Sequence, residues 1–188
     1  MYEWLLFGHL LGVALLLAGL GAHTVGVERL RHTDSPSDFA TLLAIAERGG
    51  RLVLVGGPIL VATGLTLAIR YWSLTDGWIA TAIVLVIAQG IVGSLVDRRL
   101  HELRESFEVR AREVPGVTVR NLGRDRLIQA GNGITVAVIG EILLLMTVKP
   151  AGWLILWSVG AMVVASSVGV WRAWRIAATA SRAADCRG

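Results

Sequence analysis

The chain has 188 residues, of which 54% are hydrophobic, and its mean hydropathy is +0.64. Soluble domains are about 45–50% apolar even when glycine is counted, so this chain is too apolar to be one. Its net charge of +4 would suggest a nucleic-acid partner in a soluble protein, but the basic residues here flank apolar segments. The sequence therefore indicates a single all-α membrane domain, 1–188, whose partner is the lipid bilayer and not nucleic acid.

Five apolar segments are long enough to cross the ~30 Å hydrocarbon core, which takes about 20 helical residues. The first is preceded by Glu3 and lacks the basic start of a signal peptide, so we interpret it as a retained membrane helix. The chain is predicted to be a polytopic bundle of five transmembrane helices, with spans at 4–27, 52–71, 78–96, 127–148 and 153–170.

The basic residues predict the orientation, because Lys and Arg are retained on the cytoplasmic side. If the N-terminus is outside and the C-terminus is inside, 16 of the 18 Lys and Arg residues are cytoplasmic. Arg70 and Lys149 are the two that remain outside. Trp residues near the predicted span ends agree with this topology, since they favour the membrane interface.

The predicted cytoplasmic loops are 28–51 and 97–126. In the first, Ser35 and Pro36 are typical of a helix start. Two interpretations are open for this helix: a short surface helix that ends at Gly49 and Gly50, or an inner extension of the second span. In the second loop, charge pairs at helical spacing, such as Arg104 with Glu108, predict that the third helix projects into the cytoplasm. This projecting part is either simply solvated or docks a partner.

Two ionisable residues lie well inside the predicted spans, His9 and Glu141. Such groups are costly in hydrocarbon and mark functional sites by default. Both lie roughly 8–10 Å below the outer surface at 1.5 Å per residue. Hydroxyl groups in the same outer half complete a predicted polar layer, whose members are His9, Thr63, Thr66, Thr81, Glu141 and Ser158.

Two interpretations of this layer are open. In the structural one, His9 and Glu141 form a hydrogen-bonded pair that fixes the helix register. In the functional one, they form a proton, metal or haem site. For a metal, His9 and Glu141 are the ligands. For haem, His9 is the ligand, and the small size of Gly12 beside it leaves room for a flat macrocycle. The residues alone do not determine the cofactor, and the two candidates, haem b and copper, come from the family resemblance described below.

Other intramembrane residues have predicted structural roles. His23 lies near the inner interface, where we expect it to be solvated or to snorkel toward water, and Gln89 is expected to bond across the bundle. The glycines of the first span, such as Gly12, Gly19 and Gly26, favour close helix approach. We expect that glycine-lined face to form the interface of a homo-oligomer. No phosphate-binding loop, catalytic triad or Cys/His zinc spacing is present, so the sequence does not indicate an enzyme.

Two short stretches carry a resemblance: 2–12, YEWLLFGHLLG, and 143–150, LLLMTVKP. They resemble the bacterial integral membrane family known as domain of unknown function twenty-two sixty-nine, which is distantly similar to the copper-resistance D domain and the HemJ-type protoporphyrinogen oxidases. The resemblance implies a bacterial plasma (inner) membrane location and haem or copper handling near the outer face, with His9 at the haem position. The fifth span and the lack of a lysine inside a span depart from that pattern.

Three functions follow as hypotheses. The first is a haem- or metal-associated membrane protein that uses His9, with or without Glu141. The second is a proton-coupled small permease in which Glu141 binds the proton. The third is an accessory or assembly subunit of a membrane complex, which docks its partners through the charged helix that follows the third span.

Overall fold

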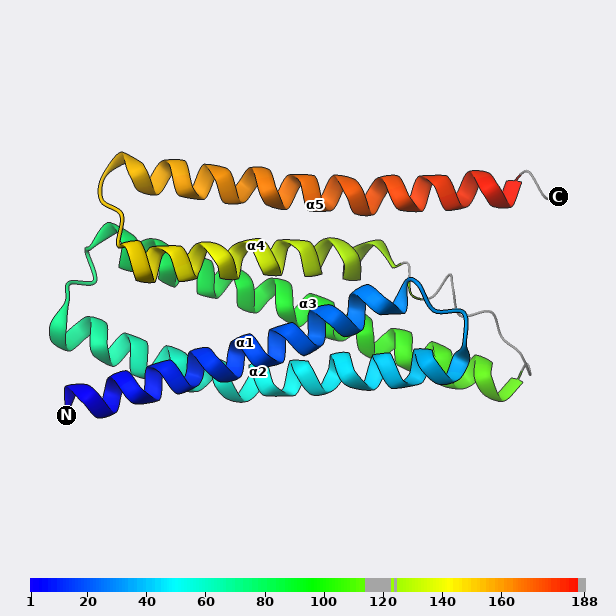
Figure 1. Cartoon of the computed structure of the whole chain (residues 1–188), viewed down its shortest axis with the longest axis horizontal. Helices are drawn as coiled ribbons and strands as arrows, with labels where there is room; N and C mark the ends of the chain where they lie inside the picture. The colour runs from blue at the N-terminus through cyan, green and yellow to red at the C-terminus, as the bar shows by residue number, and fades with distance from the viewer. Residues whose placement is uncertain (114–122, 124, 186–188) are drawn as a thin grey trace.

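The computed structural model describes residues 1–113, 123 and 125–185. They form five long helices, which run alternately up and down (Figure 1). All five are long and apolar enough to cross a membrane, which confirms the predicted all-α fold class. We call the end at which α1 begins the outer end and the opposite end the inner end, after the predicted orientation. The helices are α1 (Tyr2–Leu30), α2 (Pro36–Tyr71), α3 (Gly77–Glu113), α4 (Arg126–Val148) and α5 (Trp153–Asp185).

The first of the two predicted cytoplasmic loops, 28–51, contains no separate surface helix. The Ser35 side chain accepts a hydrogen bond from the Asp38 N–H at 3.5 Å, and Pro36 follows as the first helical residue, as predicted. However, α2 then continues through Gly49 and Gly50 to Tyr71, so the interpretation as an inner extension of the second span is the correct one. The third helix also extends inward as far as Glu113.

Glycines join α1 and α2 into a tight antiparallel pair. Gly12, Gly19 and Gly26 recur every seven residues, which places them on one helical face. A methyl group on Gly19 would lie 2.7 Å from the Gly49 carbonyl oxygen, and one on Gly12 would lie 2.7 Å from the Leu60 nitrogen. The face that we expected to join two copies of the chain is therefore occupied by α2, and that prediction of the interface is wrong.

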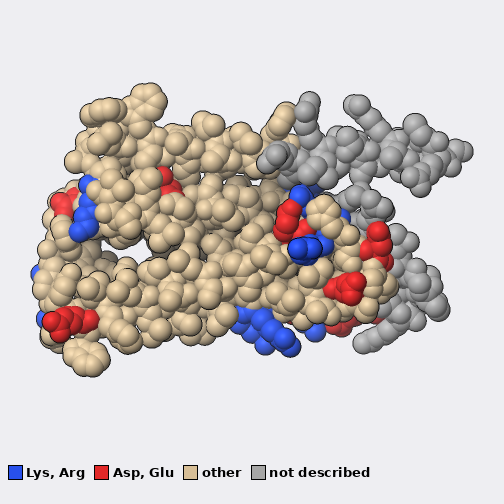
Figure 2. Space-filling model, in the orientation of Figure 1, with Lys and Arg blue, Asp and Glu red and all other residues tan. Residues whose placement is uncertain are grey.

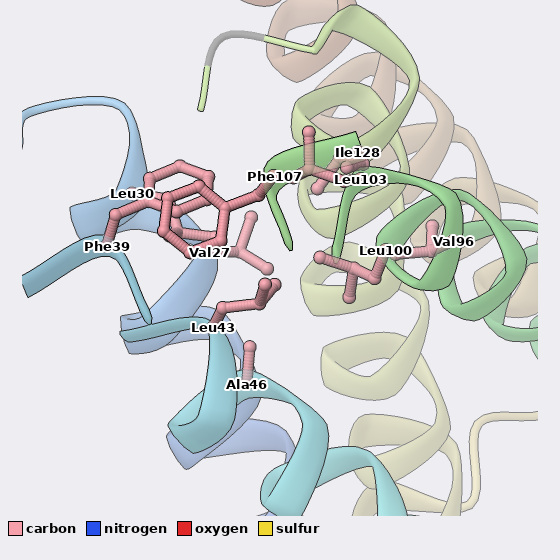
Figure 3. Packing of buried hydrophobic residues seen from close by; sticks show 10 residues of the cluster. All are labelled: Val27, Leu30, Phe39, Leu43, Ala46, Val96, Leu100, Leu103, Phe107 and Ile128. Carbon is pink, nitrogen blue, oxygen red and sulfur yellow. The ribbon is translucent and has the colours of Figure 1, made fainter. Parts of the chain in front are cut away.

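At the inner end, four helices share one hydrophobic core (Figure 3). Phe39 of α2 is fully buried, and its ring lies 4.9 Å from that of Phe107 on α3. An ion pair between Glu47 of α2 and Arg104 of α3 joins the same two helices. The inner part of α3 therefore packs on its own chain. The core consists of Val27, Leu30, Phe39, Leu43, Ala46, Val96, Leu100, Leu103, Phe107 and Ile128.

A second hydrophobic cluster joins α3 to α4 nearer the outer end. Ala82 and Leu85 of α3 pack with Val138 and Leu145 of α4, and Met162 of α5 packs against them. Helix α5 lies along the outside of the bundle (Figure 1). No residue in the most apolar stretch of this helix, within Trp153–Trp171, is buried. The molecule thus consists of an α1–α2 pair and an α3–α4–α5 group.

These two parts separate toward the outer end. Figure 2 shows an opening between the α1–α2 pair and the α3–α4–α5 group, and most charged side chains on this face lie toward the two ends of the molecule. At the outer surface, the Lys149 Nζ lies 4.0 Å from the centre of the Trp72 ring, which packs edge-on against Trp78. This contact links the end of α2 to the end of α4, so the opening is closed off at its outer limit.

Candidate functional site

His9 is held against α2. Its Nδ1 lies 3.3 Å from the Leu60 carbonyl oxygen, which can only accept a hydrogen bond, so Nδ1 carries the proton in this contact. Thr63 donates to the same carbonyl at 3.3 Å and to Ile59 O at 2.6 Å. A methyl group on Gly64 would lie 2.9 Å from the His9 ring, so glycine makes room for the imidazole. His9 thus acts as a connection between α1 and α2.

The remaining hydroxyl groups of the predicted polar layer bond to their own helices. Thr66 donates to Ala62 O, Thr81 donates to Gly77 O, and Ser158 donates to Ile155 O. Such bonds to the preceding turn are the usual way in which a membrane helix satisfies Ser and Thr. The structure therefore brings His9 and Thr63 together, but it does not assemble the six residues into one layer.

Glu141 is buried elsewhere, within the α3–α4–α5 group. The residue is only 6% exposed, and its Oε1 has no hydrogen-bond partner among the residues that the structure describes. It follows Val138 by three residues and precedes Leu145 by four, so it shares their side of α4. Glu141 does not pair with His9, because His9 faces α2 while Glu141 lies beside the α3–α4 cluster.

Three further polar groups accompany Glu141 in this part of the bundle. Gln89 of α3 donates to the Thr135 hydroxyl of α4 at 2.9 Å, which confirms that it bonds across the bundle. Asn132 is 7% exposed, and its Oδ1 has no partner among the described residues. From Asn132 to Glu141 the buried face of α4 covers about 13 Å. Sequence reasoning missed Asn132 and Thr135, although their polar character within a span was a visible signal.

His23 was also misjudged from the sequence. It is not solvated but 8% exposed, and its Nδ1 lies 3.1 Å from the Ala46 carbonyl oxygen of α2. Asp97, the first residue after the predicted third span, is close by, and its Oδ1 lies 3.4 Å from the position of a methyl group on Gly50. Burial raises the pKa of Asp97, and the nearby His23 opposes that rise.

The proposed cofactors fit these residues poorly. The described residues contain no group of three or more His, Cys, Asp or Glu side chains that could hold a metal ion. A copper site needs His9 and Glu141 together, and they lie in different parts of the bundle. The space beside Gly12, which the sequence analysis assigned to a haem macrocycle, is filled by the Leu60 backbone. No role as a cofactor site follows from His9, Gly12 and Glu141 as they are placed.

The chain matches no family model, no curated protein and no solved structure. The resemblance to the family of domain of unknown function twenty-two sixty-nine therefore stays a prediction that rests on two short stretches. The fold and the residues support a multi-pass membrane protein, and its role has to be inferred from the buried polar groups.

Proposed function

We propose that this protein is a small proton-coupled permease in which Glu141 binds the proton. The observation that carries the proposal is the burial of Glu141 in a membrane helix with one carboxyl oxygen unpartnered among the described residues. An ionised carboxylate without a partner is very costly to remove from water, whereas a neutral carboxylic acid is much less so. We therefore propose that the Glu141 carboxyl is the group that takes up a proton and releases it when a conformational change brings in water.

The surroundings of Glu141 support this role more than a purely structural one. A carboxyl group that only fixes helix register should have both oxygens hydrogen-bonded. The His9 and His23 rings are bonded in this way, each to a backbone carbonyl of α2. Instead, Gln89, Asn132 and Glu141 each leave a buried oxygen without a partner among the described residues. Unpartnered acceptors in a membrane interior are suited to a polar ligand that enters and leaves.

Labelling with a hydrophobic carbodiimide tests the protonated state of Glu141. Such reagents modify protonated carboxyl groups in apolar surroundings, so mass spectrometry of the purified protein should place the adduct on Glu141. Glu141→Gln should not be labelled there, while Glu47→Gln, which removes an acid paired with Arg104, should be labelled as the wild type is. An unmodified Glu141 in the folded wild-type protein would contradict the proposal.

Reconstituted vesicles test the transport step. Wild-type protein in vesicles that contain a pH-sensitive dye should change the internal pH when a transported solute from a panel of small polar compounds is added. Glu141→Gln should abolish this change while it retains its melting temperature, because glutamine has nearly the same shape. Proton movement that persists in Glu141→Gln would show that another residue carries the proton.

A further inference from the structure

An apolar groove separates α4 from α5. It has a volume of about 630 Å³, and its lining includes Ile134 and Val138 of α4 and Met162, Ser167 and Trp174 of α5. Trp174 is exposed, although it is a large apolar side chain. In a membrane, a groove of this composition between two helices is open to hydrocarbon chains.

A basic pocket of about 570 Å³ lies at the inner end of the same helix α4. Arg98, Arg99 and Arg126 line it, together with the acids Glu102 and Asp125. Arg99 is paired with both acids, at 2.6 Å and 2.8 Å. Within the described part of the chain, Arg98 and Arg126 have no carboxylate partner. The pocket therefore has two guanidinium groups available for an anion.

The groove and the basic pocket are neighbours along α4. The Arg126 guanidinium lies 5.4 Å from the centre of the Trp174 ring, so the same arginine borders both. Ile134 of the groove follows Leu127 of the basic pocket by seven residues, and Val138 follows Ile134 by four. These spacings place all three on one face of α4. From Leu127 to Val138 the helix rises about 16 Å. Half of the ~30 Å hydrocarbon core is about 15 Å, so this distance matches one leaflet.

We propose that the groove and the neighbouring basic pocket together bind one anionic phospholipid. Arg98 and Arg126 bind its phosphate group at the inner end, and one acyl chain lies in the groove between α4 and α5. Such a lipid requires a positive charge at one end of its site and an apolar surface about as long as one leaflet. The arginines and the groove supply these two features. This site is separate from Glu141 and does not depend on the proposed transport function.

Native mass spectrometry of the full chain in detergent tests the site with phosphatidylglycerol and phosphatidylcholine of identical acyl chains. Wild-type protein should retain the anionic lipid in preference to the zwitterionic one. Arg126→Gln should lower that preference about fivefold, since one arginine near anionic lipid contributes ~1 kcal/mol. The matched control is Arg51→Gln, which removes an exposed arginine of α2 and should leave the preference unchanged.

A second pair of variants tests the acyl chain. Ser167→Phe fills the groove and should weaken retention of both lipids, while Val168→Phe, at an exposed neighbour outside the groove, should not. Glycerol phosphate, which has the anionic group without chains, should not compete with phosphatidylglycerol. The proposal is overturned if Arg126→Gln behaves like Arg51→Gln, if Ser167→Phe behaves like Val168→Phe, or if glycerol phosphate displaces the lipid.

Discussion

The α1–α2 pair and the α3–α4–α5 group are held together in different ways. In the pair, glycines bring two backbones into contact, and the imidazoles of His9 and His23 each hydrogen-bond to a carbonyl of the facing helix. In the group, contacts between side chains join the helices, and several buried oxygens have no partner among the described residues. Thr24 of α1 is the exception in the pair. The difference suggests a rigid scaffold on one side and a region adapted to binding on the other.

Lipid explains why the pair relies on glycine. Lipid tails are as apolar as leucine side chains, so burying apolar surface between membrane helices gains little, and close van der Waals packing must replace it. We call the glycine-lined contact between α1 and α2 the glycine seam. The α3–α4–α5 group lacks such a seam over most of its described length, although Gly133 and Gly169 approach one another between α4 and α5. We therefore expect motion to occur mainly within this group or between it and the pair.

The inner core is the feature that joins the two parts, and its loss should have the largest effect. Phe39→Ala removes a fully buried ring that contacts Phe107 and should destabilise the protein by about 3–5 kcal/mol. Phe7→Ala, at a site that is 60% exposed toward lipid, is the control and should have little effect. Thermal unfolding in detergent measures both. Equal losses would mean that the inner core does not unite the two parts.

Glycine substitutions test the contact within the pair. Gly19→Ala should destabilise the protein by about 1–3 kcal/mol, because the new methyl group meets the backbone of α2, which cannot move aside as a side chain can. Gly21→Ala on the same helix and Gly140→Ala on α4 meet no atoms within 4 Å. Both should be neutral or stabilising in the same melting experiment. A tolerated Gly19→Ala would remove the argument for a tight α1–α2 seam.

The histidines should contribute less than the glycine seam. His23→Ala and His9→Ala each remove one hydrogen bond to α2, and such bonds average about 0.6 kcal/mol in membrane proteins, with a maximum near 1.7. His23 is the more deeply buried, so its loss should be larger. His9→Gln and His23→Gln should recover part of the loss, since an amide can donate to the same carbonyl. If His9→Ala costs more than Gly19→Ala, His9 has a role beyond the α1–α2 contact.

The smallest expected effect concerns Asp97, where the two parts meet at the inner end. Because burial raises the pKa of Asp97 in the folded protein, its charge at neutral pH opposes folding. Asp97→Asn should therefore raise the melting temperature slightly at pH 7. The gain should shrink as the pH falls and disappear below about pH 4, where the carboxyl group is protonated in both the folded and the unfolded chain. A gain that is independent of pH would point to a cause other than charge.

The sequence by itself determined the number of spans, the all-α class and most helix bounds. Long apolar runs between polar segments leave few alternatives, because every backbone polar group in lipid must be satisfied within a helix. Ser35 and Pro36 also placed the start of α2 correctly. Of the two interpretations left open for this helix, the one that ended it at Gly49 was wrong, because this glycine contacts α1 instead of terminating a helix.

The tertiary structure alone decided which polar residues meet. His9 and Glu141 share a predicted depth, but depth is one coordinate, and contact also requires that two helices be neighbours and turn the right faces to each other. The glycine seam commits the His9 face of α1 to α2, so Leu60 is its partner, whereas Glu141 faces its own group of helices. Residue spacing along one helix fixes a face, but only the packing of all five fixes what that face contacts.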